Sequence, residues 1–133
     1  MPPANHRLAL SLLAKTFAIC KLAAEALLPD WAMRGEFCSA TRSSEELSIV
    51  VEREFVPAEL RPREIHRVLK VHGPFALSET GVLAALVAPL AEAKVSVFTI
   101  STFNTDYLLV NCDQLQSCVI ALRNAGHEVH ESE

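Results

Sequence analysis

The apolar positions divide the chain into a first half of short runs and a more regular second half. Apolar runs at 8–13 and 16–22 predict two short strands joined by a tight turn. Two more strand-like runs flank the polar stretch "RSSEE" and predict a hairpin. Residues 23–28 suit only a short helix, because Pro29 cannot continue it.

The second half alternates between strand-like and helix-like periods. The predicted elements are a strand at 65–72, a helix at 80–93, strands at 95–101 and 106–111, a helix at 113–125 and a strand at 127–131. Ser78 or Thr80 is expected to cap the first helix, Pro89 to kink it, and Gly126 to end the second helix in a left-handed conformation. This βαββαβ order predicts an α+β fold, with helices on one face of an antiparallel sheet.

An internal repeat relates the two halves. When the chain is shifted by 60 residues, "TRSSEELSIV" (41–50) falls on "STFNTDYLLV" (101–110), and Glu46 aligns with Asp106. The prolines and alternating charges of "FVPAELRPREI" favour a boundary between the copies. We therefore expect two copies of one small unit, residues 1–60 and 61–133, the first degenerate and with a stunted helix.

Composition excludes several function classes. The net charge of −4 and the lack of a dense Lys/Arg run argue against nucleic-acid binding. No apolar run approaches the roughly 18 residues that span a bilayer, so we expect no membrane partner. The four cysteines form no CxxC pair and are interpreted as reduced thiols, which favours a cytoplasmic protein.

Catalytic and metal signatures are also missing from the sequence. No phosphate loop, catalytic triad or metal-ligand spacing appears, so we predict no enzyme, no cofactor and no metal. His127 and His130 are interpreted as surface residues rather than ligands, since strand geometry sends them to opposite faces. Cys112, beside Asp113, is interpreted as a structural thiol rather than a nucleophile.

Two segments remain that can carry binding chemistry. The helix start at Gly81 offers unpaired backbone N–H groups to an anion such as a carboxylate, although Gly81 can equally be a plain turn residue. The turn "STFNTD" offers hydroxyls, an amide and a carboxylate, although it can equally be ordinary turn chemistry. We expect the two to be neighbours, because the first strand and the strand leaving the helix should lie side by side. Such a pocket suits a zwitterion, with its ammonium group on Glu79 or Asp106.

The segment "LSETGVLAALVAPLAEAKVSVFTISTFNTDYLLV" resembles the ACT domain, a ferredoxin-like βαββαβ module. Its features are Glu79 with Gly81-Val82 at the helix start, "APLAEA" at the helix end and "ISTFNTD" in the hairpin. The resemblance is greatest to the ACT subfamily of the cytosolic arginine sensors called CASTOR and of small bacterial tandem-ACT proteins. It implies two ACT-like units, the first degenerate and without the site.

The resemblance implies a non-catalytic regulatory protein that binds an amino acid, arginine or another, at an interface between ACT units. Those sensors carry four ACT units and this chain shows two, so a comparable interface implies a homodimer. The alternative is an ACT-type interaction module whose pocket is vestigial. The residues that match the sensors' ligand pocket are Glu79, Gly81, Val82, Leu83, Thr102, Phe103 and Asp106.

Overall fold

The computed structural model describes residues 6–131, which form two compact units. The helical unit combines the chain up to Ala14 with the chain from Arg67 onward, and the strand unit is Lys15–His66. This division differs from the expected boundary between residues 60 and 61, because the N-terminal strand packs with the second half of the chain. No helix in the described part of the chain is long and apolar enough to cross a membrane.

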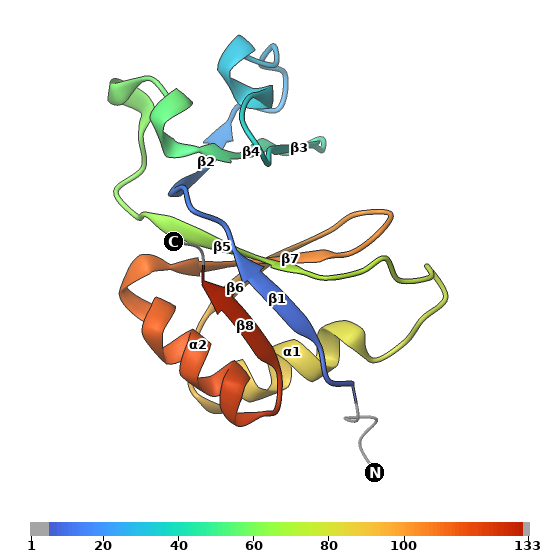
Figure 1. Ribbon diagram of the computed structural model, residues 1–133. Coiled ribbons are helices and arrows are strands. Elements are labelled where there is room, and N and C mark those ends of the chain that lie inside the picture. The colour runs from blue at the N-terminus through green and yellow to red at the C-terminus, as the bar shows by residue number, and fades with distance from the viewer. Residues whose placement is uncertain (1–5, 132–133) are drawn as a thin grey trace. The chain divides into compact units, whose positions relative to one another are not determined.

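The helical unit contains the predicted βαββαβ order, with one extra strand. Its elements are β1 (Ala9–Leu12), β5 (His66–Val71), α1 (Val82–Glu92), β6 (Val97–Ser101), β7 (Asp106–Asn111), the 3₁₀ turn η4 (Cys112–Gln114), α2 (Leu115–Asn124) and β8 (Glu128–Glu131). The strands follow the order β8-β1-β5-β7-β6. Both helices cover the same face of this sheet (Figure 1), so the α+β prediction is confirmed.

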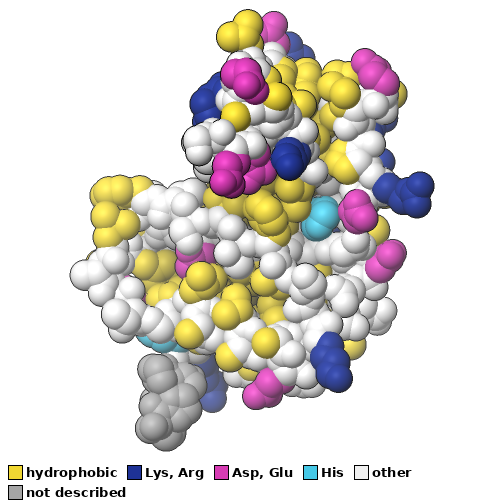
Figure 2. Space-filling view, turned by 180° about the vertical axis from the view of Figure 1, so that it is seen from behind, with side chains coloured by type: hydrophobic (Ala, Val, Ile, Leu, Met, Phe, Trp, Pro, Cys, Tyr) yellow, Lys and Arg dark blue, Asp and Glu magenta, His cyan; other side chains and the backbone are white. Residues whose placement is uncertain are grey.

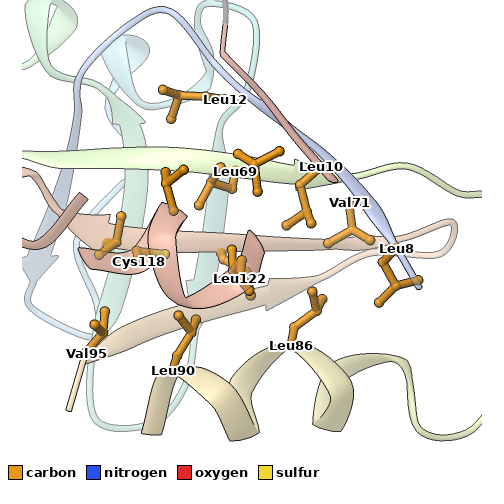
Figure 3. Close-up of a cluster of buried hydrophobic side chains, with 14 of the residues drawn as sticks. Leu8, Leu10, Leu12, Leu69, Val71, Leu86, Leu90, Val95, Cys118 and Leu122 are labelled. Carbon is orange, nitrogen blue, oxygen red and sulfur yellow. The ribbon is translucent and has the colours of Figure 1, made fainter. Parts of the chain in front are cut away.

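The extra strand, β1, lies between the two strands that a plain βαββαβ unit would pair. Leu10 is opposite Val71 of β5 in an antiparallel pair and opposite Val129 of β8 in a parallel pair. Every second residue from Leu8 to Leu12 is buried in the core beneath the helices, together with Leu86 and Leu122 (Figure 3). This apolar alternation explains why β1 belongs to the helical unit.

The strand unit is an antiparallel sheet of order β3-β4-β2, and 3₁₀ turns lie between and after its strands. Its elements are β2 (Phe17–Leu22), η1 (Asp30–Met33), β3 (Ser39–Arg42), β4 (Leu47–Glu52), η2 (Arg53–Phe55) and η3 (Ala58–Leu60). The strands predicted at 8–13 and 16–22 exist, but β2 pairs with β4 and β1 pairs with β5 and β8. The helix predicted at 23–28 is wrong: these residues form a turn and extended chain, because Pro29 leaves too few residues to repay helix nucleation.

The hairpin repeat is real, but its register is one residue from the predicted one. Arg42 pairs with Leu47 in the strand unit as Ser101 pairs with Asp106 in the helical unit. The turns match as well: Ser43 N–H donates to Glu46 O (2.9 Å), and Thr102 N–H donates to Thr105 O (2.8 Å). Buried Leu47, rather than Glu46, therefore occupies the position of Asp106, and the first copy has no acid there.

Charged side chains are dispersed over the face in Figure 2, where Lys and Arg stand apart from one another and among acidic groups. The long apolar helix α1 contributes little charge to the surface, since Glu92 is its one ionisable residue.

Candidate functional site

A pocket of about 200 Å³ lies in the helical unit, bounded by the loop after β5, the start of α1 and the β6–β7 turn. It brings together five of the seven predicted site residues: Glu79, Val82, Thr102, Phe103 and Asp106. The other two lie beside the pocket rather than in its lining. Gly81 precedes α1, and Leu83 is half-buried against the core.

The β6–β7 turn is held by its own hydroxyl groups. Buried Thr105 donates its hydroxyl to the carbonyl oxygen of Val71 (2.7 Å), at the end of β5. Thr102 accepts the Thr105 N–H at its hydroxyl oxygen (3.3 Å) and donates to the Thr105 carbonyl (3.0 Å). Both interpretations of this turn therefore apply. The threonine hydroxyls stabilise the turn by hydrogen bonds, and the same turn forms a wall of the pocket.

The loop after β5 is drawn tightly against this turn. Phe75 N–H donates to the carbonyl oxygen of Asn104 (2.8 Å). A Cβ atom at Gly73 would lie 2.9 Å from that same oxygen, closer than such contacts allow. Glycine at position 73 thus permits the close approach of the two loops that bound the pocket.

Helix α1 begins without a side-chain cap. Gly81 is its N-cap, with φ = +86°, and within residues 6–131 no side-chain cap bonds to the first turn. The predicted caps Ser78 and Thr80 are therefore wrong, and the Thr80 carbonyl instead contacts Nε2 of His6 (3.0 Å). The first intrahelical bond runs from Ala85 N–H to Gly81 O (3.0 Å). The amides of the first turn are consequently left to a ligand or to water.

Acidic groups set the charge of the pocket. Ser101 donates its hydroxyl to Oδ1 of Asp106 (2.5 Å), which fixes the carboxylate at the start of β7. Glu79 lies on an exposed loop across the pocket, and none of the described residues that line the pocket is Lys, Arg or His. Two carboxylates without a balancing base favour a cationic group in the pocket.

The strand that lies beside β5 differs from the predicted one. β7, rather than the strand leaving the helix, lies beside β5, and β6 pairs with β7. The two candidate segments still meet, because Asp106 begins β7 and Thr105 bonds to β5.

Six lining residues were not among the predicted site residues: Phe75, Ala76, Leu77, Ser101, Asn104 and Thr105. Ser101, Asn104 and Thr105 carried a signal, since they belong to the polar turn "STFNTD". Residues 75–77 carried none, because a short loop without regular period gives no indication of which side faces a ligand.

The burial of the histidines and cysteines agrees only in part with the predictions from the sequence. His127 was expected at the surface, but it is buried, with 5% of its surface exposed. His130 is exposed as expected and stacks on His72, with ring centroids 5.7 Å apart. Cys118 is buried, whereas Cys112 is exposed and does not pack as a structural thiol. Among residues 6–131, no group of three or more His, Cys, Asp or Glu is arranged to hold a metal ion.

Family models match both halves of the chain. The model described as ACT domain matches residues 63–124, and a second model, of an N-terminal domain, matches residues 15–59. The chain is 43% identical over 66 residues to the rat protein named "Cytosolic arginine sensor for mTORC1 subunit 1", and 38% identical over 61 residues to its human counterpart. These matches cover 49% and 45% of this chain, but only 20% and 18% of those proteins. The chain thus spans about a fifth of the length of these curated relatives.

Solved structures extend the likeness to nearly the whole chain. An Agobacterium tumefaciens protein is 34% identical, with a TM-score of 0.87 and 96% of each chain covered. Aspartate kinase of Clostridium acetobutylicum is 14% identical, with a TM-score of 0.65 over 90% of this chain and 35% of the kinase, which shows the fold alone. From the fold, the matching model and these relatives, we conclude that residues 63–124 belong to the ACT-domain family, and that this chain is similar to the cytosolic arginine sensors over about half of its length.

Proposed function

We propose that this protein is a non-catalytic regulatory protein that binds a free amino acid with a cationic side chain, of which arginine is the first to test. The observation that carries the proposal is the pocket beside the uncapped start of α1, where Glu79 and Asp106 supply two carboxylates without a balancing base. The first-turn amides of α1 are complementary to the carboxylate of a zwitterion, and Asp106, at the start of β7, is complementary to its cationic end.

In the proposed binding mode, the ligand carboxylate accepts hydrogen bonds from the first-turn amides of α1, beginning at Val82. Its cationic group contacts Asp106 through Oδ2, since Oδ1 is already engaged by Ser101. Glu79 adds a second negative charge from the neighbouring loop. The pocket volume of about 200 Å³ favours a single small metabolite over a larger ligand.

A second copy of the chain would complete this site. Leu77 and Phe103 line the pocket, yet they are 72% and 76% exposed. Large apolar side chains with such exposure at a pocket mouth are typical of surfaces that become covered. All lining residues come from the helical unit, so we propose that the cover is supplied by another protomer in a homodimer.

The comparisons support this assignment in two ways. The rat and human relatives are named as arginine sensors, and the ACT-domain model matches residues 63–124, which contain the pocket. Because the match covers about a fifth of those proteins, the ligand of this chain has to be measured directly.

The experiment is a thermal-shift screen of the twenty amino acids, followed by calorimetric titration of any that stabilise the protein. Binding to the folded state raises the unfolding temperature in a saturable way. We expect Asp106→Asn to abolish the shift and Glu79→Gln to weaken it. Glu92→Gln is the matched control, since Glu92 is an exposed acid at the opposite end of α1. A panel that produces no shift with folded protein would refute ligand binding.

The alternative is an interaction module with a vestigial pocket, and one contact favours it: Asp106 already accepts a hydrogen bond from Ser101. If a protein group fully replaces the ligand, Ser101→Ala should lower stability and leave the amino-acid screen negative. If the hydroxyl only orients the carboxylate, Ser101→Ala should weaken ligand binding while the protein stays folded.

A further inference from the structure

Two exposed histidines meet on the face of the helical unit's sheet that lies opposite the helices (Figure 1). The imidazoles of His72 and His130 have ring centroids 5.7 Å apart, and their planes are within 7° of parallel. Val71 and Val129, which precede them in the chain, are buried beneath the helices, so the two histidines project from the other face. Neither is among the described residues that line the pocket, so the pair is separate from the amino-acid site.

The register of three strands brings these histidines together, although no spacing in the sequence links them. β1 lies between β5 and β8, and Ser11 is opposite both Lys70 of β5 and His130 of β8. His72 follows β5, and its N–H donates to the carbonyl oxygen of Ala9 (2.8 Å). Cross-strand neighbours point to the same face of a sheet, so the histidines stand on either side of β1. The small side chains of Ala9 and Ser11 leave room for the two rings to meet above that strand.

One nitrogen of each ring is already engaged by a neighbouring oxygen. Nε2 of His72 lies 2.6 Å from Oγ of Ser11, and Nε2 of His130 lies 3.3 Å from Oε1 of Glu128. With the ring proton on Nε2, both imidazoles donate to these oxygens, and Nδ1 of each ring carries the lone pair that binds a metal. Contacts of this kind orient metal-bound histidines and fix their tautomer.

We propose that His72 and His130 form a binding site for a divalent transition-metal ion, with zinc as the reference ion. Neutral imidazole is a preferred ligand of zinc, copper and nickel. Two imidazoles on one tetrahedral zinc ion, with Zn–N distances of about 2.0–2.1 Å, have ring centres roughly 5 Å apart. The strands hold the two rings near that spacing, and the change that remains is a rotation of exposed imidazoles about their side-chain bonds.

The number of ligands and the charges around them indicate reversible binding. Two protein ligands leave the other coordination positions to water, whereas structural zinc sites have four protein ligands. The neighbouring charges oppose one another: Glu128 attracts a cation, and Lys70, on the same face of the sheet, repels it. The ion is therefore one that the protein takes up and releases, rather than one that the fold requires.

A bound ion would link the end of β5 to β8 across β1, because its two ligands come from opposite sides of that strand. Binding to the folded state alone raises the unfolding temperature in a saturable way. The site uses neither the pocket nor an amino acid, so it goes beyond the proposed function and adds a second ligand to the same sheet.

Calorimetric titration of the full chain with zinc chloride, in buffer free of other metals and of amino acids, tests the site. The chain carries Cys112→Ser, which removes an exposed thiol that would compete for zinc. We expect His72→Gln and His130→Gln each to raise the zinc dissociation constant at least about tenfold. His6→Gln is the matched control, since His6 contacts Thr80 rather than this pair, and it should leave zinc binding unchanged.

Three results would overturn the proposal. They are a folded parent protein that binds no zinc, histidine variants that bind zinc as tightly as the parent, and magnesium binding as tight as zinc binding. Magnesium prefers oxygen ligands, so equal binding would mean that the imidazoles are not the ligands. Both substitutions change exposed side chains, so the circular dichroism spectrum should stay that of the parent. Because the titration contains no amino acid, its outcome and that of the amino-acid screen are judged separately.

Discussion

Nε2 of His127 lies 3.0 Å from the carbonyl oxygen of Ala85, in the middle of α1. In a regular helix this carbonyl would accept a hydrogen bond from the N–H of residue 89. Residue 89 is proline, which has no N–H, so the carbonyl lacks that helical donor. Nδ1 of the same imidazole accepts the N–H of Leu8 (3.1 Å), so the neutral ring carries its proton on Nε2 and donates it to Ala85. His127 thus satisfies a helix carbonyl that Pro89 leaves open, and ties α1 to the chain before β1.

His127→Ala should lower the free energy of unfolding by roughly 2–5 kcal/mol, since it leaves two buried backbone groups without partners. Pro89→Ala restores an amide to the helix and gives Ala85 a partner of its own. The cost of His127→Ala should therefore be about 1 kcal/mol smaller in the Pro89→Ala background. Urea denaturation of the four proteins measures this coupling. Strictly additive costs would show that the Ala85 contact contributes nothing to stability.

His127 also shows where sequence reasoning stops. Helices α1 and α2, the β6–β7 hairpin and the Gly126 cap follow local patterns and were predicted close to their observed bounds. The role of His127 depends on a carbonyl 42 positions away in the chain and on a strand that inserts between β5 and β8. Neither of these features changes the pattern of apolar residues near position 127, so the prediction that His127 lies at the surface was wrong.

The candidate site, like the fold, was predicted from the sequence only in part. Hydroxyl, amide and acidic residues concentrate in one turn, and the resemblance to ACT domains named five of the residues that line the pocket. The apolar wall of Phe75 and Leu77 was not predicted, since its position follows from the tight approach of the loop at Gly73. The register of the repeat was one residue off, because polarity marks a turn but does not fix which residue begins the next strand.

Gly35→Ala should destabilise the protein more than Gly126→Ala. Both glycines have positive φ (+87° and +98°), so both variants incur left-handed strain of about 1–2 kcal/mol. At Gly35 the added Cβ would also lie 2.5 Å from Oε2 of Glu52. That carboxylate is buried and accepts the Glu36 N–H (2.7 Å), so it cannot move aside freely. Chemical denaturation should separate the two variants, and equal losses would mean that Glu52 yields without cost.

Acid should weaken the fold partly through His66. Burial lowers the pKa of His66 below its ordinary value of 6.5, although the nearby Glu64 opposes this shift. Nδ1 of His66 is buried without a hydrogen-bond partner among the described residues. The folded state therefore binds a proton less readily than the unfolded state, and the stability that His66 contributes is present above pH 6.5 and lost as the pH falls from that value through the lower pKa of the folded state.

His66→Gln, which cannot titrate, should flatten the dependence of the unfolding free energy on pH between about pH 8 and pH 5. His130→Gln is the matched control, because His130 is exposed. We expect the control to keep the wild-type slope more closely than His66→Gln does. A His66→Gln variant with an unchanged slope would assign the acid sensitivity to other groups.

Thiol labelling should separate the cysteines by burial. Burial raises the pKa of Cys118 to about 11 and raises the pKa of Cys20 as well, so neither forms the reactive thiolate readily at neutral pH. Cys112 is exposed and accessible to reagent. Brief treatment with iodoacetamide at about pH 8, followed by peptide mass spectrometry, should therefore modify Cys112 first in the native protein. In urea all four thiols should react at similar rates, because unfolding removes the burial. If native Cys118 reacted as fast as Cys112, α2 would have to open from the core on the timescale of labelling.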